Sequence, residues 1–418
     1  MHDLLVIGGG PAGSSAAYWA AEHGLDVVLV ERDAFPREKS CGDSLTPRAV
    51  KQLHDMGLEG KLRQYHRVHG VRAVAHHRTL ELRWPEHPTF PDYGYVIRRS
   101  VLDTLVADNA VARGAVLHTH AEALAPVMRN GMLIGASVRD HNTGLTENIA
   151  ARYVVVADGS SSNFGRALGT SRDGTYPQGV AIRGYFASPM HNDPWIESTL
   201  DVRDRDGKSL PGYGWAFPVG DGTINVGVGL LSTFRDWKSV NTAHLMGEFA
   251  ATIRLRWGID PEAPVAAPAS GGLPMGGSVG PKVGPNWLVV GDAAGSINPF
   301  NGAGTEYAYE TGRLAATLVA EALATRNGLA IQQYPRLLDE EFRLYFKVAR
   351  MFAKLIGSPT LMRELTRVGM HSQSLMDWAL RIMANLLRPD EVGAAEAAYT
   401  AIAALVRLVP DSIAATKG

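Results

Sequence analysis

The chain has 418 residues, of which 45% are hydrophobic, 20% charged and 8% aromatic, and its 41 basic and 42 acidic side chains leave a net charge of −1. This composition excludes a disordered or collagen-like chain, and the balanced charge gives no global field that would attract nucleic acid. The length predicts two or three structural units around a sizeable core.

The first thirty residues have the pattern of a strand, a tight turn, a helix and a second strand. The apolar run Leu4 to Ile7 leads into a glycine-rich turn, and Val27 to Val30 forms a strand that ends at Glu31. Three glycines in this turn stand at GxGxxG spacing, namely Gly8, Gly10 and Gly13. This spacing predicts a dinucleotide site with phosphate at the helix start and Glu31 on the adenosine ribose, without separating NAD from FAD.

Cys41 is the single cysteine. It excludes an intramolecular disulfide framework and fits a reducing compartment. The N-terminus lacks the features of a signal peptide, the longest uncharged stretch, 263–282, is too rich in Pro and Gly to span a bilayer, and the histidines lack metal-binding spacing. We therefore expect a cytoplasmic protein without a metal.

Two strands follow in the middle of the chain. The apolar, β-branched run Tyr153 to Ala157 ends at Asp158, and open α/β sheets bind ligands at such carboxyl ends. Further on, Tyr213, Trp215 and Phe217 alternate as one face of a strand would present them. Their rings suit a long apolar ligand such as an isoprenoid chain, although an aromatic core strand would show the same pattern.

A third strand, Trp287 to Val290, ends at Gly291-Asp292, and a Gly- and Pro-rich loop then leads to a helix predicted from Thr305 to Leu323. Asp292 can hold a sugar-like hydroxyl chain, the glycines allow close backbone approach, and the free N–H groups of the helix start face the ligand. Such a site would stabilise the negative charge of a reduced flavin, so these features favour FAD over NAD.

Residues Phe342 to Ile356 predict an amphipathic helix. It carries a narrow basic stripe made of Arg343, Lys347, Arg350 and Lys354. Two interpretations stay open, a buried helix whose charges reach water and an interfacial helix attracted to anionic lipid.

Together the glycine turn with Glu31, the Arg99-x-x-Leu102-Asp103 segment and the two Asp–Gly turns resemble the FAD-binding core of the aromatic-hydroxylase-like flavoproteins. Within that group, three segments resemble the geranylgeranyl reductase family. They are PREKSCGD at 36–43, YGWAFP at 213–218 and PFNGAG at 299–304. The likeness spans roughly residues 1 to 330. Many family members carry a glutamate where this chain has Ala303, so another group would have to supply any chemical role of that glutamate.

The resemblance implies a set of FAD-binding residues. It comprises Gly8, Gly10, Pro11, Ala12, Gly13, Glu31, Arg32, Cys41, Gly42, Arg99, Asp158, Asp292, Pro299, Gly302, Ala303 and Gly304. Arg99 would pair with the cofactor near its phosphates, Asp292 would hold the ribityl-phosphate region, and Gly302 to Gly304 would lie against the isoalloxazine.

The resemblance also implies a function, the FAD-dependent saturation of a C=C bond in a polyprenyl chain, and specifically of one isoprene unit of menaquinone. An isolated alkene needs a hydride at one carbon and a proton at the other, in a dry site. The expected catalytic residues are Cys41, Tyr213 and Trp215, with Asp43 as a further source of the proton. Tyr213, Trp215 and Phe217 are expected to contact the substrate. Only one GxGxxG is present, so we expect an external electron donor, whose identity the sequence leaves open.

The predicted fold is an α/β protein with a Rossmann-like FAD-binding domain of the aromatic-hydroxylase type (1–70, 95–175 and 275–330), an inserted β-rich substrate-binding domain (71–94 and 176–274) and a helical C-terminal region (331–418). Three other functions stay open: a geranylgeranyl-lipid reductase, a flavin monooxygenase that hydroxylates or epoxidises a lipophilic substrate, and a non-catalytic, FAD-containing prenyl-lipid-binding protein. A lipid substrate favours peripheral attachment to the inner face of the cell membrane.

Overall fold

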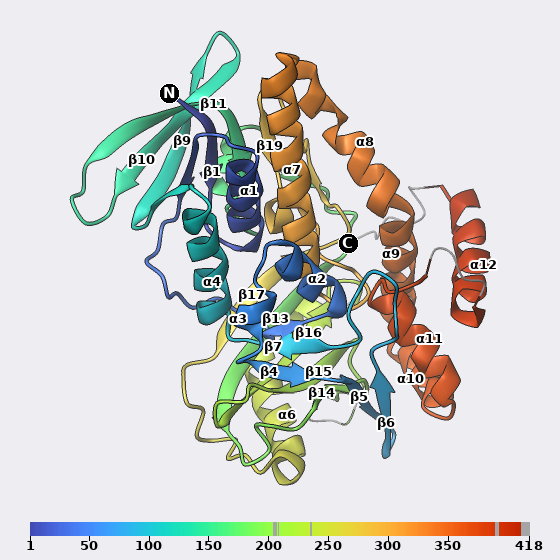
Figure 1. The fold of residues 1–418 in the computed structure, drawn as a ribbon. Coiled ribbons are helices and arrows are strands. Elements are labelled where there is room, and N and C mark those ends of the chain that lie inside the picture. The colour runs from blue at the N-terminus through green and yellow to red at the C-terminus, as the bar shows by residue number, and fades with distance from the viewer. Residues whose placement is uncertain (204–206, 208, 235, 389–392, 411–418) are drawn as a thin grey trace.

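The computed structural model describes residues 1–203, 207, 209–234, 236–388 and 393–410. Its first large sheet has seven strands in the order β8–β2–β1–β11–β10–β9, with β19 paired to β11 (Figure 1). The strands are β1 (His2–Ile7), β2 (Val27–Val30), β8 (Val116–His118), β9 (Ala121–Arg129), β10 (Met132–Asp140), β11 (Thr146–Val156) and β19 (Trp287–Val289). The pairs β8–β2, β2–β1, β1–β11 and β11–β19 are parallel, whereas β9 and β10 form an antiparallel extension.

Three helices pack beside this sheet, and α1 lies between α4 and α7 (Figure 1). They are α1 (Pro11–Glu22), α4 (Arg99–Ala112) and α7 (Thr305–Thr325). Small residues such as Ala16 and Gly312 meet at the α1–α7 contact, where a Cβ on Gly312 would lie 2.3 Å from the Ala12 carbonyl oxygen. This close packing fixes the starts of both helices at the carboxyl end of the parallel strands.

The second large sheet also has seven strands, in the order β17–β13–β16–β15–β14–β5–β6. Its strands are β5 (Gly70–Ala75), β6 (Arg78–Arg83), β13 (Gln178–Ala187), β14 (Trp195–Thr199), β15 (Gly212–Pro218), β16 (Thr223–Leu231) and β17 (Ala269–Pro274). All its pairs are antiparallel except β5–β14. Helix α6 (Thr242–Trp257) packs on one face, where Phe249 and Trp257 join the buried core of this sheet.

Shorter elements complete the fold around the two large sheets. Strands β3 (Ser44–Leu45), β7 (Gly94–Val96) and β4 (His66–Val68) form a small sheet, and β12 (Ser171–Arg172) pairs with β18 (Val279–Gly280). The accompanying helices are α2 (Pro47–Asp55), α3 (Glu59–Leu62), α5 (Asn163–Ala167) and the single turns η1 (Trp237–Ser239) and η2 (Gly291–Ala294).

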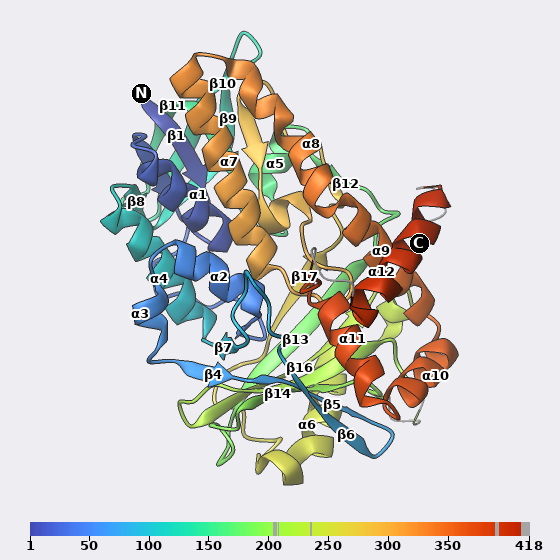
Figure 2. The same ribbon diagram turned by 45° about the vertical axis from the view of Figure 1, so that its right-hand side comes forward.

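The C-terminal part is helical; its first helices lie against α7, and its later ones lie to one side of the second sheet (Figure 2). It contains η3 (Gly328–Gln333), α8 (Tyr334–Leu338), the π-helical turn η4 (Asp339–Arg343), α9 (Leu344–Ile356), α10 (Pro359–Gly369), α11 (Gln373–Met383) and α12 (Ala394–Leu408). In the part of the chain that the structure describes, none of the helices has the length and hydropathy needed to cross a bilayer.

The predicted strands and helices are present with small shifts of their ends. Val27–Val30 is a strand as predicted, the run from Tyr153 is the last part of β11, and the helix from Thr305 continues to Thr325. The fold class is confirmed, whereas the domain boundaries stay a prediction.

The structure corrects the interpretation of the basic stripe on 342–356. Lys347 and Arg350 are only 9% and 7% exposed. The Lys347 ammonium donates to the Val409 carbonyl, and the Arg350 guanidinium donates to the Gly276 carbonyl and lies over the Tyr176 ring. Since two of the four charges bind the protein interior, α9 is not an interfacial helix whose whole basic face meets lipid.

Candidate active site

The glycine turn between β1 and α1 forms a cradle that side chains would fill. A Cβ on Gly13 would lie 1.8 Å from the Gly8 carbonyl oxygen, and Gly8 has a φ of 97°, which only glycine adopts readily. Helix α1 starts at Pro11 after Gly10, and no described side chain caps its first N–H groups. These groups are therefore open to an anionic ligand such as a pyrophosphate.

Glu31 is buried at the end of β2 and faces this turn. One of its carboxylate oxygens accepts a 2.8 Å hydrogen bond from the Gly9 N–H, and the other accepts one from the Asp33 N–H. The Arg37 guanidinium lies 3.5 Å from the same carboxylate. The Glu31 carboxylate, which was predicted to bind the ribose of a dinucleotide, is thus fixed beside the glycines.

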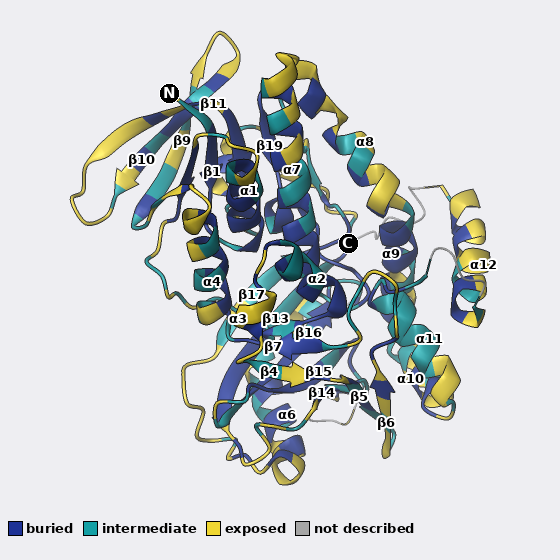
Figure 3. Ribbon diagram, in the orientation of Figure 1, coloured by how far each residue is buried: buried dark blue, intermediate teal, exposed yellow. Residues whose placement is uncertain are grey.

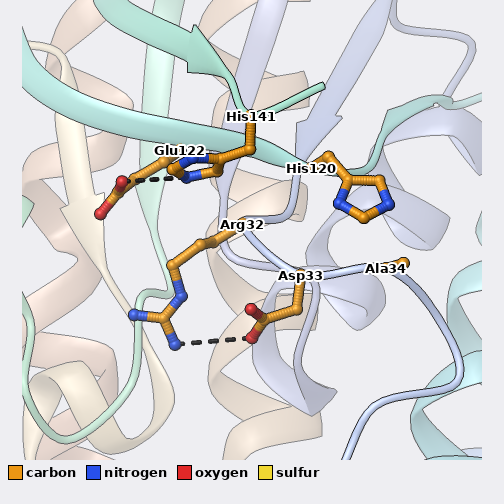
Figure 4. A pocket seen from close by; sticks show the side chains of 6 residues that line it. All are labelled: Arg32, Asp33, Ala34, His120, Glu122 and His141. Atoms are coloured by element: carbon orange, nitrogen blue, oxygen red, sulfur yellow. Dashed lines mark hydrogen bonds and ion pairs between the residues drawn. The ribbon is translucent and has the colours of Figure 1, made fainter. Parts of the chain in front are cut away.

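A pocket opens just beyond Glu31 and has a volume of about 410 Å³. Arg32, Asp33, Ala34, His120, Glu122 and His141 line it (Figure 4). Arg32 pairs with Asp33 and His141 with Glu122, so the charged side chains lie along the walls. The size and position of this pocket suit the adenine end of the cofactor.

Arg99 is held inside the protein. Its guanidinium makes two hydrogen bonds of 2.8 and 2.9 Å to Asp103 and interacts electrostatically with Cys41. Arg37 lies 3.3 Å from Asp103 and 3.5 Å from the position of a Cβ on Gly10. The arginine that faces the glycine turn is therefore Arg37, while Arg99 supports it through Asp103.

The two strand-end aspartates have different surroundings. Asp158 accepts a 2.9 Å hydrogen bond from the Phe164 N–H at the start of α5, and burial raises the pKa of its carboxyl. Asp292 lies 3.4 Å from the Lys39 ammonium, and one of its oxygens is 3.5 Å from the position of a Cβ on Gly304. The structure therefore brings Asp292, and less directly Asp158, to the cofactor side of the sheet.

The loop that precedes α7 is fixed by its own asparagines. The Asn298 side chain accepts a hydrogen bond from the Phe300 N–H, and the Asn301 side chain accepts one from the Ala303 N–H. Both side-chain amides also donate to the Met383 carbonyl at the end of α11, at 3.0 Å each. The loop that contains Pro299 and Gly302 thus presents the uncapped start of α7, which follows Gly304.

The three predicted aromatic residues form a continuous wall on β15. Ring centroids lie 5.8 Å apart for Tyr213 and Trp215 and 6.1 Å apart for Trp215 and Phe217. The Trp215 ring packs on the bare backbone of Gly227, where a Cβ would lie 2.2 Å away. Leu380 of α11 joins the same apolar cluster, together with Ala384 and Leu386, which follow the helix.

Cys41 and Asp43 lie where this wall meets the cofactor side. Cys41 is partly buried, and its sulfur accepts a 3.4 Å hydrogen bond from the Asp43 N–H. Asp43 is fully buried and accepts hydrogen bonds from Tyr185, Asn225 and the Arg99 N–H. Burial raises the pKa of the Asp43 carboxyl against the opposing effect of these donors. Asn225 also donates to the Cys41 carbonyl at 2.8 Å.

Comparison with known proteins is consistent with this geometry. The FAD binding domain family matches residues 1–201. The menaquinone reductase of Mycolicibacterium smegmatis is 40% identical over 93% of this chain and 93% of its own length, and that of Mycobacterium tuberculosis is 39% identical over 93% and 92%. The digeranylgeranylglycerophospholipid reductase 2 of Methanosphaera stadtmanae is 33% identical over 82% of this chain and 85% of its own. The chain belongs to the geranylgeranyl reductase family of FAD-dependent oxidoreductases.

A solved structure supports the fold of this reductase. The geranylgeranyl bacteriochlorophyll reductase-like protein of Thermoplasma acidophilum superposes with a TM-score of 0.78 over 96% of this chain and 99% of its own, at 22% identity. The relatives and the matched FAD binding domain confirm the family resemblance, the enzyme class and the FAD cofactor inferred from the sequence, while the roles of individual site residues stay predictions.

Several residues of this reductase's site were not singled out from the sequence. Arg37 was quoted only as part of a motif, and the partners Tyr185 and Asn225 around Asp43 were not identified. Glu306 and Tyr309 in the first turns of α7 are 2% and 0% exposed. A glutamate so near the Ala303 position was a signal that the sequence contained.

Proposed function

We propose that this reductase saturates a C=C bond of a polyprenyl chain and that its substrate is menaquinone, reduced at one isoprene unit. The aromatic wall of Tyr213, Trp215 and Phe217 carries the proposal, because α11 covers an apolar surface directly beside the loop that begins α7. The names of the bacterial relatives, at 39–40% identity along nearly the whole chain, support the choice of menaquinone.

The described residues fit FAD along one side of the first sheet. We assign the pyrophosphate to the open N–H groups after Gly10, the ribose to Glu31 and the adenine to the pocket beside Arg32. Asp292 and the uncapped start of α7 would hold the ribityl chain and the flavin ring. When bound and reduced, FAD supplies the hydride that the reaction needs.

The protein would supply the proton, and Cys41 is the side chain that we assign to this step. The Tyr213 hydroxyl already donates its proton in a hydrogen bond to the Asn301 carbonyl, and burial together with Cys41 raises its pKa to about 12. Asp43 is enclosed by three donors. Cys41 is partly buried beside both Tyr213 and Arg99.

A membrane surface would deliver such a substrate. We propose that α10 and α12 make this contact, since both show extensive exposed surface (Figure 3). Their exposed apolar side chains include Leu365, Val368, Leu405 and Leu408. Flotation with anionic vesicles should recover the protein with the lipid, and the double substitution of Leu405 and Leu408 by Glu should abolish recovery.

The reaction is tested with the purified, reduced holoenzyme and menaquinone in the absence of air. A product heavier by two hydrogens, formed as the flavin is reoxidised, supports the proposal. Product only in the presence of oxygen would instead identify a monooxygenase, and tight prenyl binding without flavin reoxidation would identify a binding protein. A parallel assay with an archaeal-type geranylgeranyl lipid distinguishes the other reductase activity. Since the electron donor is external in this proposal, a chemical reductant replaces it.

A further inference from the structure

Two buried polar atoms near the start of α7 have no hydrogen-bond partner among the described residues. They are Oε1 of Glu306 and the hydroxyl oxygen of Tyr309. Their side chains are 2% and 0% exposed. Burying an unpaired carboxylate or hydroxyl costs free energy, so such atoms need a reason to persist. They lie three residues apart, which places both side chains on neighbouring positions of one helix face.

The surroundings of the two residues lead toward the catalytic region. Tyr309 interacts electrostatically with Glu306, with the Arg99–Asp103 pair and with Cys41. Tyr309 thus has a buried carboxyl and the cysteine that we assign as the proton donor within its electrostatic surroundings, and it shares a helix face with that carboxyl.

Among the described residues, the charged or titratable groups that interact with Glu306 include members of α2, α7 and α9. Arg48 on α2 is bound bidentately by Glu310 and also by Glu341, so it is not dedicated to Glu306. Thr46 hydrogen-bonds with the carboxylate, and the tyrosines that interact with it are Tyr307, Tyr309 and Tyr345. Burial, opposed by Arg48 and Thr46 and reinforced by Glu310, raises the pKa of Glu306 to about 7.

We propose that Glu306 is the proton reservoir of this reductase and recharges the proton donor Cys41 through the hydroxyl of Tyr309. The inference rests on the proposed function, because it names the source of the proton consumed there.

The proton and electron balance is simple. Saturation forms two C–H bonds: a hydride brings both electrons and leaves the flavin oxidised, and the Cys41 S–H bond breaks to give the proton. The Tyr309 O–H proton passes to the sulfur as the Glu306 O–H proton passes to the Tyr309 oxygen. Glu306 ends as a carboxylate and regains a proton from solvent between turnovers. A group that titrates near neutral pH is suited to this exchange.

The test compares Glu306→Gln and Tyr309→Phe with Glu341→Gln as a matched control, since Glu341 also binds Arg48 but has an exposed side chain. Flavin reoxidation by menaquinone is followed from about pH 5 to about pH 9. We expect the wild-type rate to fall as the pH rises through about 7. Glu306→Gln and Tyr309→Phe should be slower by about 100-fold and lose this pH dependence, whereas Glu341→Gln should behave as the wild type. Wild-type rates and pH profiles in both Glu306→Gln and Tyr309→Phe would overturn the proposal.

A second readout does not need turnover. Infrared spectroscopy of the holoenzyme should show a protonated carboxyl that titrates near pH 7 and is missing in Glu306→Gln. A Glu306 carboxyl that is ionised throughout the range overturns the inference, even if Glu306→Gln is inactive. If the wild type fails to reoxidise with any polyprenyl substrate, the proposed function is overturned and the relay falls with it. If the wild type is active and the Glu306→Gln and Tyr309→Phe variants are slow, the result supports the relay and leaves the proposed function unchanged.

Discussion

The hydroxyl of Tyr213 donates a 2.8 Å hydrogen bond to the main-chain carbonyl of Asn301. Tyr213 belongs to the second sheet, whereas Asn301 belongs to the loop 298–304 that precedes α7. One bond therefore joins the aromatic wall to this loop, which we call the cofactor loop. The aromatic wall and the loop to which we assign the flavin are thereby held in a fixed relationship, which a hydride transfer between flavin and substrate would require.

Removing this bond should loosen the cofactor loop. Tyr213→Phe keeps the ring in the wall and deletes only the hydroxyl, a loss of about 1 kcal/mol for a typical hydrogen bond. We expect FAD affinity to fall about fivefold, measured by fluorescence titration of the apoprotein. Tyr65→Phe, at a partly buried position just after α3, should leave the affinity unchanged. Equal affinities in Tyr213→Phe and wild type would contradict the assigned role.

Gly13 allows the closest approach in the glycine turn. In Gly13→Ala the new methyl group would overlap the Gly8 carbonyl oxygen, so the turn must open. We expect FAD affinity to fall about tenfold or more, seen as loss of yellow colour on purification. The control is Gly60→Ala in α3, where nothing lies within 4 Å of the added atom. A fully loaded Gly13→Ala enzyme would show that the turn does not carry the phosphates.

The pKa of Glu306 predicts an unusual dependence of stability on pH. The folded carboxyl titrates near 7 and the unfolded one near its ordinary 4.5, so the unfolded state loses its proton first. Stability therefore falls as the pH rises between these values, by roughly 3 kcal/mol in total. The side chain of Glu306→Gln cannot ionise. The unfolding free energy of this variant minus that of the wild type, measured with urea, should therefore be larger at about pH 8 than at about pH 4. If the variant and the wild type differ in unfolding free energy by the same amount at both pH values, the pKa of Glu306 is not raised.

Trp215 positions the Cys41 segment through Asn225. Its indole N–H donates a 2.9 Å hydrogen bond to the Asn225 side chain, which in turn donates to Cys41 and Asp43. Trp215→Phe leaves a buried acceptor unpaired, so we expect a loss of about 2 kcal/mol in unfolding free energy and slower turnover. Trp19→Phe on α1 provides a comparison without this network. Unchanged turnover in Trp215→Phe would contradict the role of Trp215 in positioning the Cys41 segment.

The strands and the aromatic wall could be predicted from the sequence because their signals are local. Val27–Val30 is a short β-branched run, and the spacing of Tyr213, Trp215 and Phe217 alone places their rings on one face. The partners of α9 could not be predicted, since Lys347 and Arg350 bind carbonyls contributed by residues 62 positions later and 74 positions earlier in the chain.

The same limit applies to the site. Glu31 was predictable from its distance to the glycines, but the choice between Arg37 and Arg99 depends on how α4 lies against the turn, a long-range contact. Likewise, only the rotation of α7 about its axis decides that Glu306 faces inward rather than toward water.

The carbonyl of Met383 accepts hydrogen bonds from Asn298, Asn301 and Tyr345. Helix α11, whose end carries this carbonyl, is also the cover of the aromatic surface. Any displacement of α11 would therefore be transmitted, through this one carbonyl, to the segment that begins α7.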